Sequence, residues 1–270
     1  MNLVAGHCAA TPGPPLRQTC GPYTSLAPHY DMALGFESFR HTRRLFECLV
    51  RELVIRFASA ADVGCGTGLF AKYLSRRWRV PVFGVDLSPA MLRVARKNCD
   101  REKVRLLHQD FRCLRLPEPV DLITANFDTV NHLVRRGDLG QAFRCVARNL
   151  QPRGHFVFDF LTHCQPFVSR RPFLRRLRGA NGEIQQWFRW FPEFNRLAVR
   201  IVGRSPSSSC PSVENHFERV YTPEEVGRDL LNAGLIVRRV YDAWTLRPAT
   251  VCAPRLLVVA QKPGRGGQSG

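Results

Sequence analysis

The clearest chemical signal in this sequence is a glycine-rich turn followed by two acids, each at the end of a short apolar stretch. The turn runs from Asp62 to Gly68 and reads D-V-G-C-G-T-G. Glycine permits positive φ in a tight turn and lets a ligand approach the backbone closely. A carboxylate at Asp86 could accept hydrogen bonds from both hydroxyls of a ribose, and Asp110 with its aromatic neighbour Phe111 could bind an adenine. The pattern predicts a nucleoside-binding site.

The spacing of apolar residues predicts the elements that must position these groups. Short apolar runs predict strands at about 59–63, 81–86, 103–108, 120–125 and 154–161, and helical periodicity predicts helices at about 36–57, 68–78, 88–99 and 138–150. Ser88 followed by Pro89 is typical of a helix start. Alternating strands and helices predict a parallel sheet covered by helices on both faces. Such sheets bind ligands at the carboxyl ends of their strands, where the turn and both acids stand.

The pattern changes after about residue 162. Residues 183–203 and 213–221 alternate between residue types and carry many aromatics, which predicts inserted antiparallel strands. Thr222 and Glu225 form a capping box ahead of a helix, and two last strands at about 235–243 and 255–261 form a hairpin. The expected organisation is a flexible arm (1–24), an α/β core (25–163), an antiparallel β cap (164–221), the rest of the core (222–263) and a disordered tail (264–270).

The glycine turn also separates two kinds of nucleoside cofactor. Dinucleotide-binding folds carry G-x-G-x-x-G, whereas this chain has G-x-G-x-G preceded by an acid. Together with G-V-D-L-S-P-A-M at 84–91 and H-Q-D-F at 108–111, the turn resembles the class I S-adenosylmethionine (SAM)-dependent methyltransferases over residues 30–262. The resemblance implies SAM as the cofactor. It also implies a Rossmann-like sheet of seven strands, the last antiparallel, with helices on both faces and a small antiparallel β insertion.

The resemblance further implies which residues hold SAM. Asp62 and the glycines would lie near its methionine portion, Asp86 would bind the ribose, and Asp110 with Phe111 would lie at the adenine. The implied cofactor-binding residues are Tyr30, Asp62, Gly64, Cys65, Gly66, Gly68, Asp86, Leu87, Met91, Asp110, Phe111 and Asn126.

The sequence gives fewer signals for the residues that would bind the methyl acceptor. Many DNA and protein-glutamine N-methyltransferases carry N/D-P-P-Y/F after the fourth strand, and this chain has A-N-F-D at 125–128 instead. The chain therefore lacks that kind of base or amide pocket. Its inserted cap resembles that of bacterial small-molecule enzymes, on the stretches N-F-D-T-V-N-H-L at 126–133 and E-N-H-F-E-R-V-Y at 214–221.

Methyl transfer is an in-line displacement, so alignment of donor and acceptor is its main requirement. A general base is needed only when the acceptor must lose a proton. His132 and His216 are candidates for that base. The alternatives are a hydrogen-bonded structural histidine for His132 and a solvated polar strand face for His216, which shares its face with Glu214 and Glu218. Candidates for substrate binding are Asn131, Trp187 and Arg219, although Trp187 could instead pack in the cap's own core.

Composition narrows the class of protein and its partners. No run approaches the ~18–20 apolar residues of a membrane span, and the first residues show no secretory signal, so a cytoplasmic protein with no membrane partner is expected. The ten cysteines have no zinc-type spacing, which predicts reduced thiols and no metal site. The net charge of +18 comes from arginines spread along the chain, with one dense run at 170–178.

The function that these observations favour is transfer of a methyl group from SAM to an O, N or C atom of a small molecule. An RNA methyltransferase remains an alternative because of the charge, although nucleic-acid surfaces usually gather their charge into a stripe. A SAM-binding protein without catalysis is a second alternative. The acceptor atom and the oligomeric state do not follow from the sequence.

Overall fold

The computed structural model describes residues 21–164, 173–179, 182–204 and 211–264. Residues 1–20 of the predicted arm (1–24) and residues 265–270 of the predicted tail lie outside the described residues. Arg170 and Arg171 of the arginine run lie outside them too. Within these ranges, no helix is long and apolar enough to cross a lipid bilayer.

A seven-stranded sheet forms the core, in the order β10-β11-β5-β4-β1-β2-β3. Its strands are β1 (Ala60–Val63), β2 (Val82–Asp86), β3 (Val104–His108), β4 (Val120–Ala125), β5 (Leu150–Leu161), β10 (Ile236–Asp242) and β11 (Arg255–Gln261). β1 to β5 pair in parallel, and β11 runs antiparallel to both β5 and β10. The Rossmann-like class I fold predicted from the sequence is confirmed.

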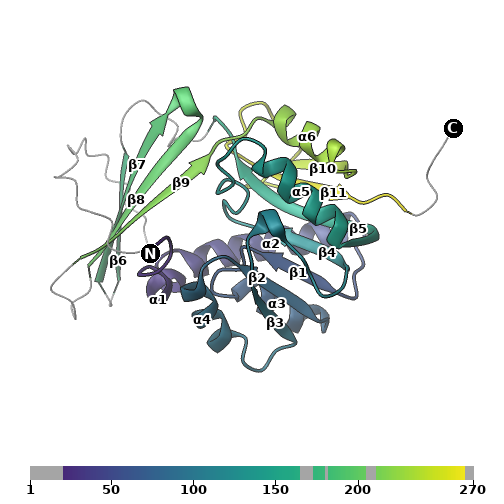
Figure 1. The fold of residues 1–270 in the computed structure, drawn as a ribbon, viewed down its shortest axis with the longest axis horizontal. Helices are drawn as coiled ribbons and strands as arrows, with labels where there is room; N and C mark the ends of the chain where they lie inside the picture. Colours follow the sequence, from purple (N-terminus) through teal and green to yellow (C-terminus); the bar gives the residue numbers. More distant parts are fainter. Residues whose placement is uncertain (1–20, 165–172, 180–181, 205–210, 265–270) are drawn as a thin grey trace.

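Helices cover both faces of this sheet, as Figure 1 shows. They are α2 (Phe36–Glu52), α3 (Leu69–Trp78), α4 (Pro89–Asn98), α5 (Asp138–Asn149) and α6 (Pro223–Asn232). Alternation along β5 explains the two layers: Phe156, Phe158 and Phe160 pack with α5 and α6, whereas Val157 packs on the side of α2 and α3. The strand is buried on both faces, as expected for a central strand of an α/β sheet.

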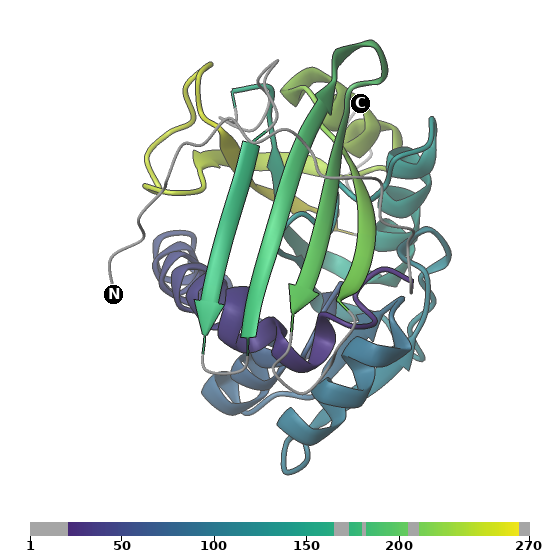
Figure 2. The same cartoon turned by 90° about the vertical axis from the view of Figure 1, so that its left-hand side faces the viewer.

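A second, four-stranded antiparallel sheet stands beside the core and is called the cap below. Its strands, in spatial order, are β6 (Phe173–Gly179), β7 (Gly182–Phe191), β8 (Arg196–Arg204) and β9 (Ser212–Arg219). A short helix α1 (Ala27–Tyr30) and a π-helical turn η1 (Asp31–Gly35) lead into α2. Figure 2 shows this N-terminal segment, in purple, crossing the lower part of the cap.

Three elements differ from the sequence-based expectation. The leading helix ends at Glu52 instead of about residue 57, because Val54 adopts a φ of 51° that no α-helix continues. β5 begins at Leu150 rather than 154. β6 was not expected, because its sequence F-L-R-R-L-R-G lacks the simple alternation that marks β8 and β9.

Candidate active site

The glycine-rich turn joins β1 to α3 at the carboxyl edge of the parallel strands. Gly64, Gly66 and Gly68 adopt φ values of 68°, 53° and 80°, a region that residues with side chains rarely enter. A Cβ atom on Gly64 would lie 2.3 Å from Oγ1 of Thr129. A Cβ atom on Gly66 would meet no described atom within 4 Å. Protein atoms therefore pack tightly against the turn at Gly64, whereas the space beside Gly66 is open to a ligand.

Asp62 lies buried below the turn, at 2% exposure. Its Oδ1 accepts hydrogen bonds from Oγ1 of Thr124 at 2.8 Å and from Nδ2 of Asn126 at 3.4 Å. Burial raises the pKa of Asp62 to about 7, although these two hydrogen bonds oppose the rise. The carboxyl group is therefore poised between its two charge states near neutral pH, and an approaching cation would favour the charged form.

Asp86 ends β2 and faces the same turn. Its Oδ2 accepts a hydrogen bond from the backbone N–H of Gly66, and its Oδ1 accepts one from Ser88, each at 2.8 Å. Burial raises the pKa of Asp86, and the two backbone hydrogen bonds oppose that rise. Because a carboxylate can accept about four hydrogen bonds, lone pairs remain for a diol. Among the neighbours predicted to bind the cofactor, Leu87 is exposed, while Met91 is buried against the N-terminal segment.

The side chain of Asp110 interacts with residues next to it in the sequence. Its carboxylate caps the short 3-10 helix that starts at Phe111, and it pairs with Arg112 at 2.5 Å. The hydrogen bonds from Arg112 lower the pKa of Asp110, so this acid is ionised. Phe111 packs into the core at 8% exposure. The structure thus brings Asp110 to the same sheet edge as Asp86, and contact of either residue with an adenine stays a prediction.

The N-terminal segment closes over the glycine turn. The hydroxyl of Thr67 donates a hydrogen bond to Asp31, and Nδ2 of Asn98 donates to Oδ2 of Asp31 at 3.1 Å. These bonds hold Tyr30 between the cap and the sheet edge, where it packs with the buried Met91. Burial, reinforced by nearby carboxylates, raises the pKa of Tyr30 well above its usual range, so the phenol stays neutral.

The inner face of β9 is buried, which corrects one sequence-based alternative. Glu214, His216 and Glu218 are 1%, 4% and 8% exposed, so they do not form a solvated polar strand face. The carboxylate of Glu214 accepts hydrogen bonds from the backbone N–H groups of Tyr23, Ser25 and Leu26 and lies 3.0 Å from Nε2 of His216. Residues 21–24, predicted as part of a flexible arm, are therefore held against the cap.

His132 lies on the loop after β4 and faces the same segment. Its Nε2 is 2.9 Å from the hydroxyl of Tyr23, whose ring stacks edge-on against His216 with centroids 4.5 Å apart. Burial, with a smaller effect from His216, lowers the pKa of His132 to about 4. His132 is therefore a neutral, hydrogen-bonded side chain near pH 7. The structure brings both candidate histidines together around one tyrosine that the sequence did not single out.

Two of the three substrate-binding candidates have structural roles. Asn131 is 0% exposed, and its amide bridges the backbone carbonyl of Arg219 and the backbone N–H of Leu161. Arg219 pairs with Glu225 at 2.9 Å and lies over the ring of Tyr221. Asn131 thus joins β5 and β9 from a fully buried position, and contact of Asn131 or Arg219 with a substrate stays a prediction.

The cap's aromatic residues divide between its two faces. Phe188 is buried in a cluster with Leu26 and Val199, and Trp190 packs against the same cluster. Trp187 alternates with them on β7 and is only partly buried. The inner face supplies the cap's own core, and Trp187 lies on the other face, away from Tyr30.

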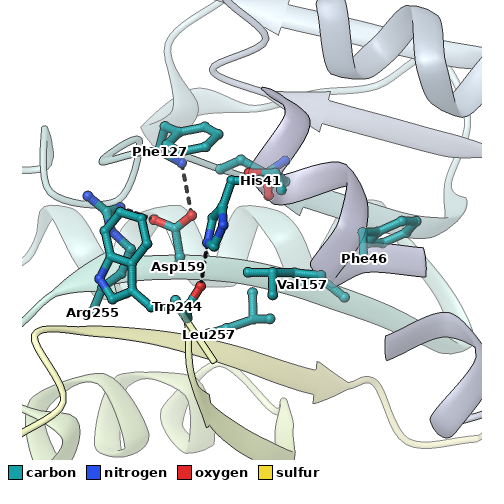
Figure 3. A pocket seen from close by; sticks show the side chains of 12 residues that line it. His41, Phe46, Phe127, Val157, Asp159, Trp244, Arg255 and Leu257 are labelled. Atoms are coloured by element: carbon teal, nitrogen blue, oxygen red, sulfur yellow. Dashed lines mark hydrogen bonds and ion pairs between the residues drawn. The ribbon is translucent and has the colours of Figure 1, made fainter. Parts of the chain in front are cut away.

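An ion-pair network supports the loop that follows β4, as Figure 3 shows in part. Arg255 donates to Asp159 and, at 2.6 Å, to Asp128, while Asp159 accepts from the backbone N–H of Phe127 at 3.0 Å. Phe127 and Asp128 have φ values of 50° and 58°, which are strained for such residues. Beside the network lies a small pocket, between α2 and the strands β5 and β11, lined in part by His41, Asn126 and Trp244.

These residues fit the cofactor that the resemblance implies. The open approach at Gly66 could admit an extended ligand close to the backbone, and Asp86 could accept a ribose diol. Asp62 could receive a positively charged group. Sequence reasoning placed Glu218 on the face of His216 through the alternating pattern of β9. It missed four residues that come from segments far apart in the chain, namely Tyr23, Asp128, Asp159 and Arg255.

Comparisons with known proteins agree with this geometry. The family described as a methyltransferase domain matches residues 60–154. The chain is 32% identical over 246 residues to YqeM of Bacillus subtilis (strain 168), a protein named provisionally as a methyltransferase, and covers 97% of it. That match spans 89% of this chain.

A sugar-modifying relative is also similar. The dTDP-3-amino-3,6-dideoxy-alpha-D-glucopyranose N,N-dimethyltransferase of Streptomyces fradiae is 29% identical over 153 residues, which are 57% of this chain and 58% of that protein. Among solved structures, a SAM-dependent methyltransferase from Clostridium acetobutylicum superposes with a TM-score of 0.77 at 21% identity, over 90% of this chain and 99% of that one.

Proposed function

Because this chain belongs to the class I SAM-dependent methyltransferases, we propose that it methylates an O, N or C atom of a small molecule held between the sheet edge and the cap. The observation that carries the proposal is the N-terminal segment with Tyr23 and Tyr30, which hydrogen bonds join to both the cap and the glycine turn. The cap and the N-terminal segment cover the carboxyl ends of the parallel strands. A chain or duplex of nucleic acid needs an open channel, whereas this arrangement favours a compact acceptor.

The chain's own residues would act mainly by alignment. SAM, when bound, supplies a methyl group on a positively charged sulfur, ready for in-line displacement. Gly66, Asp62 and Asp86 would fix the donor from below, and the cap would exclude water from above. Holding two reactants in this way can account for ~7–11 kcal/mol of the barrier. His132 would orient the hydroxyl of Tyr23, because a histidine with a pKa of about 4 is a weak base at neutral pH.

The test uses SAM labelled on its methyl group, purified enzyme and a cell extract separated afterwards into small molecules, nucleic acid and protein. We expect label in the small-molecule fraction. Asp86→Ala should abolish it by removing the ribose contact, whereas Asp100→Ala, at an exposed position, should leave it unchanged. Label that remains with macromolecules and is released by ribonuclease would instead establish an RNA methyltransferase. An absence of label with retained SAM binding would point to a binding protein without catalysis.

A further inference from the structure

Glu218 is the inward-facing residue of β9 that lies nearest to the loop after β4. It is 8% exposed, and its neighbour on β8, Leu197, is 1% exposed. Glu214 is satisfied by backbone N–H groups of the N-terminal segment and by His216. By contrast, no hydrogen bond or ion pair from the described residues reaches the carboxyl group of Glu218. The carboxyl oxygens of Glu218 are not among the fully enclosed, unpartnered polar atoms of the described residues, so they keep some accessible surface that a ligand can reach. A mostly buried carboxyl group is costly, so a function that needs it is expected.

The groups around Glu218 come from three parts of the chain. Tyr23 and Tyr30 belong to the N-terminal segment, Asp128 follows β4, and Arg255 begins β11. Burial raises the pKa of Glu218 well above its usual range; Asp128 raises it further, and Arg255 opposes the rise. This end of β9 lies against the loop after β4, where the backbone N–H of Arg219 donates a hydrogen bond to the backbone carbonyl of Asn131 at 2.7 Å.

The charges around Glu218 do not balance. Arg255 is already paired with both Asp128 and Asp159, so the guanidinium has two carboxylates before Glu218 is counted. The nearby His132 is neutral near pH 7. The rings of Tyr23 and Tyr30 pack edge-on against each other, with centroids 6.0 Å apart, and aromatic faces attract cations. Carboxyl groups beside neutral aromatic rings form a site for a small cation, ammonium above all.

We propose that Glu218, with Asp128 beside it, binds the amino group of the acceptor, so that this enzyme methylates a primary or secondary amine. The inference rests on the function proposed above and narrows its acceptor atom to nitrogen. The positive charge of the ammonium group favours the ionised form of Glu218, and this carboxylate takes one proton from the ammonium group. The freed nitrogen lone pair then forms the bond to the methyl carbon, and the electron pair of the broken carbon–sulfur bond stays on sulfur.

The first test needs no knowledge of the acceptor. The small-molecule fraction of the extract is divided, and one half is treated with acetic anhydride and then mild base, which leaves primary and secondary amines as neutral amides and restores hydroxyl groups. We expect the treated half to take up at least tenfold less label. Equal label in both halves would overturn the inference and leave the methyltransferase function standing. No label in either half would remove the proposed function and the inference together.

The second test assigns the effect to Glu218. Glu218→Gln should lower the kcat/KM for the untreated fraction at least tenfold, whereas Glu193→Gln, at an exposed position of the short 3-10 helix between β7 and β8, should not change it. The affinities for SAM and for S-adenosylhomocysteine, measured by calorimetry, should both stay within twofold, and Tm should not fall. Weakened binding of SAM alone would show that Glu218 serves the sulfonium and would overturn the inference. Activity within threefold of wild type would also overturn it.

Discussion

The glycine turn and the inner face of β9 both form hydrogen bonds with the N-terminal segment, yet they are built in different ways. In the turn, Asp62, Gly64 and Asp86 lie within one strand–helix–strand unit. Asp86 accepts hydrogen bonds from backbone groups of that unit, and Asp62 accepts them from side chains at the end of the adjacent strand β4. On the cap, Glu214 is satisfied by residues about 190 positions away in sequence.

Local sequence pattern is enough to predict the glycine turn, but it is not enough to predict the burial of the acids on β9. A positive φ or a strand-end carboxylate is a local requirement, which a few residues fulfil by themselves. Burial of an acid on β9 is a global outcome, because it depends on which segment covers that face. Substitutions that alter one region at a time should separate the two, most strongly at Gly64 and most weakly at Phe217.

Gly64→Ala should have the largest effect. An alanine at position 64 would have a strained positive φ, and its Cβ atom would lie 2.3 Å from Oγ1 of Thr129. We therefore expect a loss of at least about 4 kcal/mol in the free energy of unfolding. Gly66→Ala is the matched control, since its Cβ would enter open space. It should cost only about 1 kcal/mol but abolish binding of S-adenosylhomocysteine. Urea unfolding and calorimetry measure the two quantities, and equal destabilisation by both variants would contradict the expectation.

Asp62→Asn should change how stability depends on pH. A buried acid with a raised pKa contributes stability that is complete below its ordinary value of 3.8 and is lost as pH rises to about 7. The asparagine of the variant does not ionise, so the variant does not lose this stability as pH rises. Its stability relative to wild type should therefore increase by about 4 kcal/mol between pH 4 and pH 8. Urea unfolding over that range provides the measurement, and a difference that is constant with pH would show that Asp62 is not strongly desolvated.

Glu214→Gln should release the N-terminal segment from the cap. Burial raises the pKa of Glu214, but hydrogen bonds from His216, Ser25 and Leu26 outweigh it and lower the pKa to about 2. The stability from this group is therefore present above its ordinary value of 4.5 and is lost as pH falls toward 2. At pH 7 we expect a loss of about 2–3 kcal/mol and faster proteolysis near residue 23. Proteolysis unchanged from that of Glu193→Gln would rule out this anchor.

Phe217→Ala should have the smallest effect. Its side chain lies on the outer face of β9 and is 51% exposed, so its removal should change the free energy of unfolding by no more than about 0.5 kcal/mol. Val199→Ala, on the inner face at 4% exposure, should cost about 1–2 kcal/mol. Thermal unfolding of both variants tests which face of the cap is buried. A larger loss of stability for Phe217→Ala than for Val199→Ala would mean that the cap packs through its other face.

Much of the α/β core could be predicted because its signals are local. The apolar runs of β1, β2 and β4 and the capping box of Thr222 and Glu225 appear at the expected places. The cap was harder, because β6 carries no clear alternation and its pairing with β7 depends on contacts that only the folded chain makes.

The sequence by itself determined the class of the protein, through the turn of Asp62 to Gly68 and the acid at Asp86, since each of these residue types meets a requirement of its own backbone or ligand. Only the tertiary structure decided the surroundings of the acceptor. Asn131 became a bridge between strands, His132 became a neutral partner of Tyr23, and Glu218 became a buried carboxyl group facing Asp128. The physical reason is that burial and charge depend on neighbours that the fold brings together from distant parts of the chain.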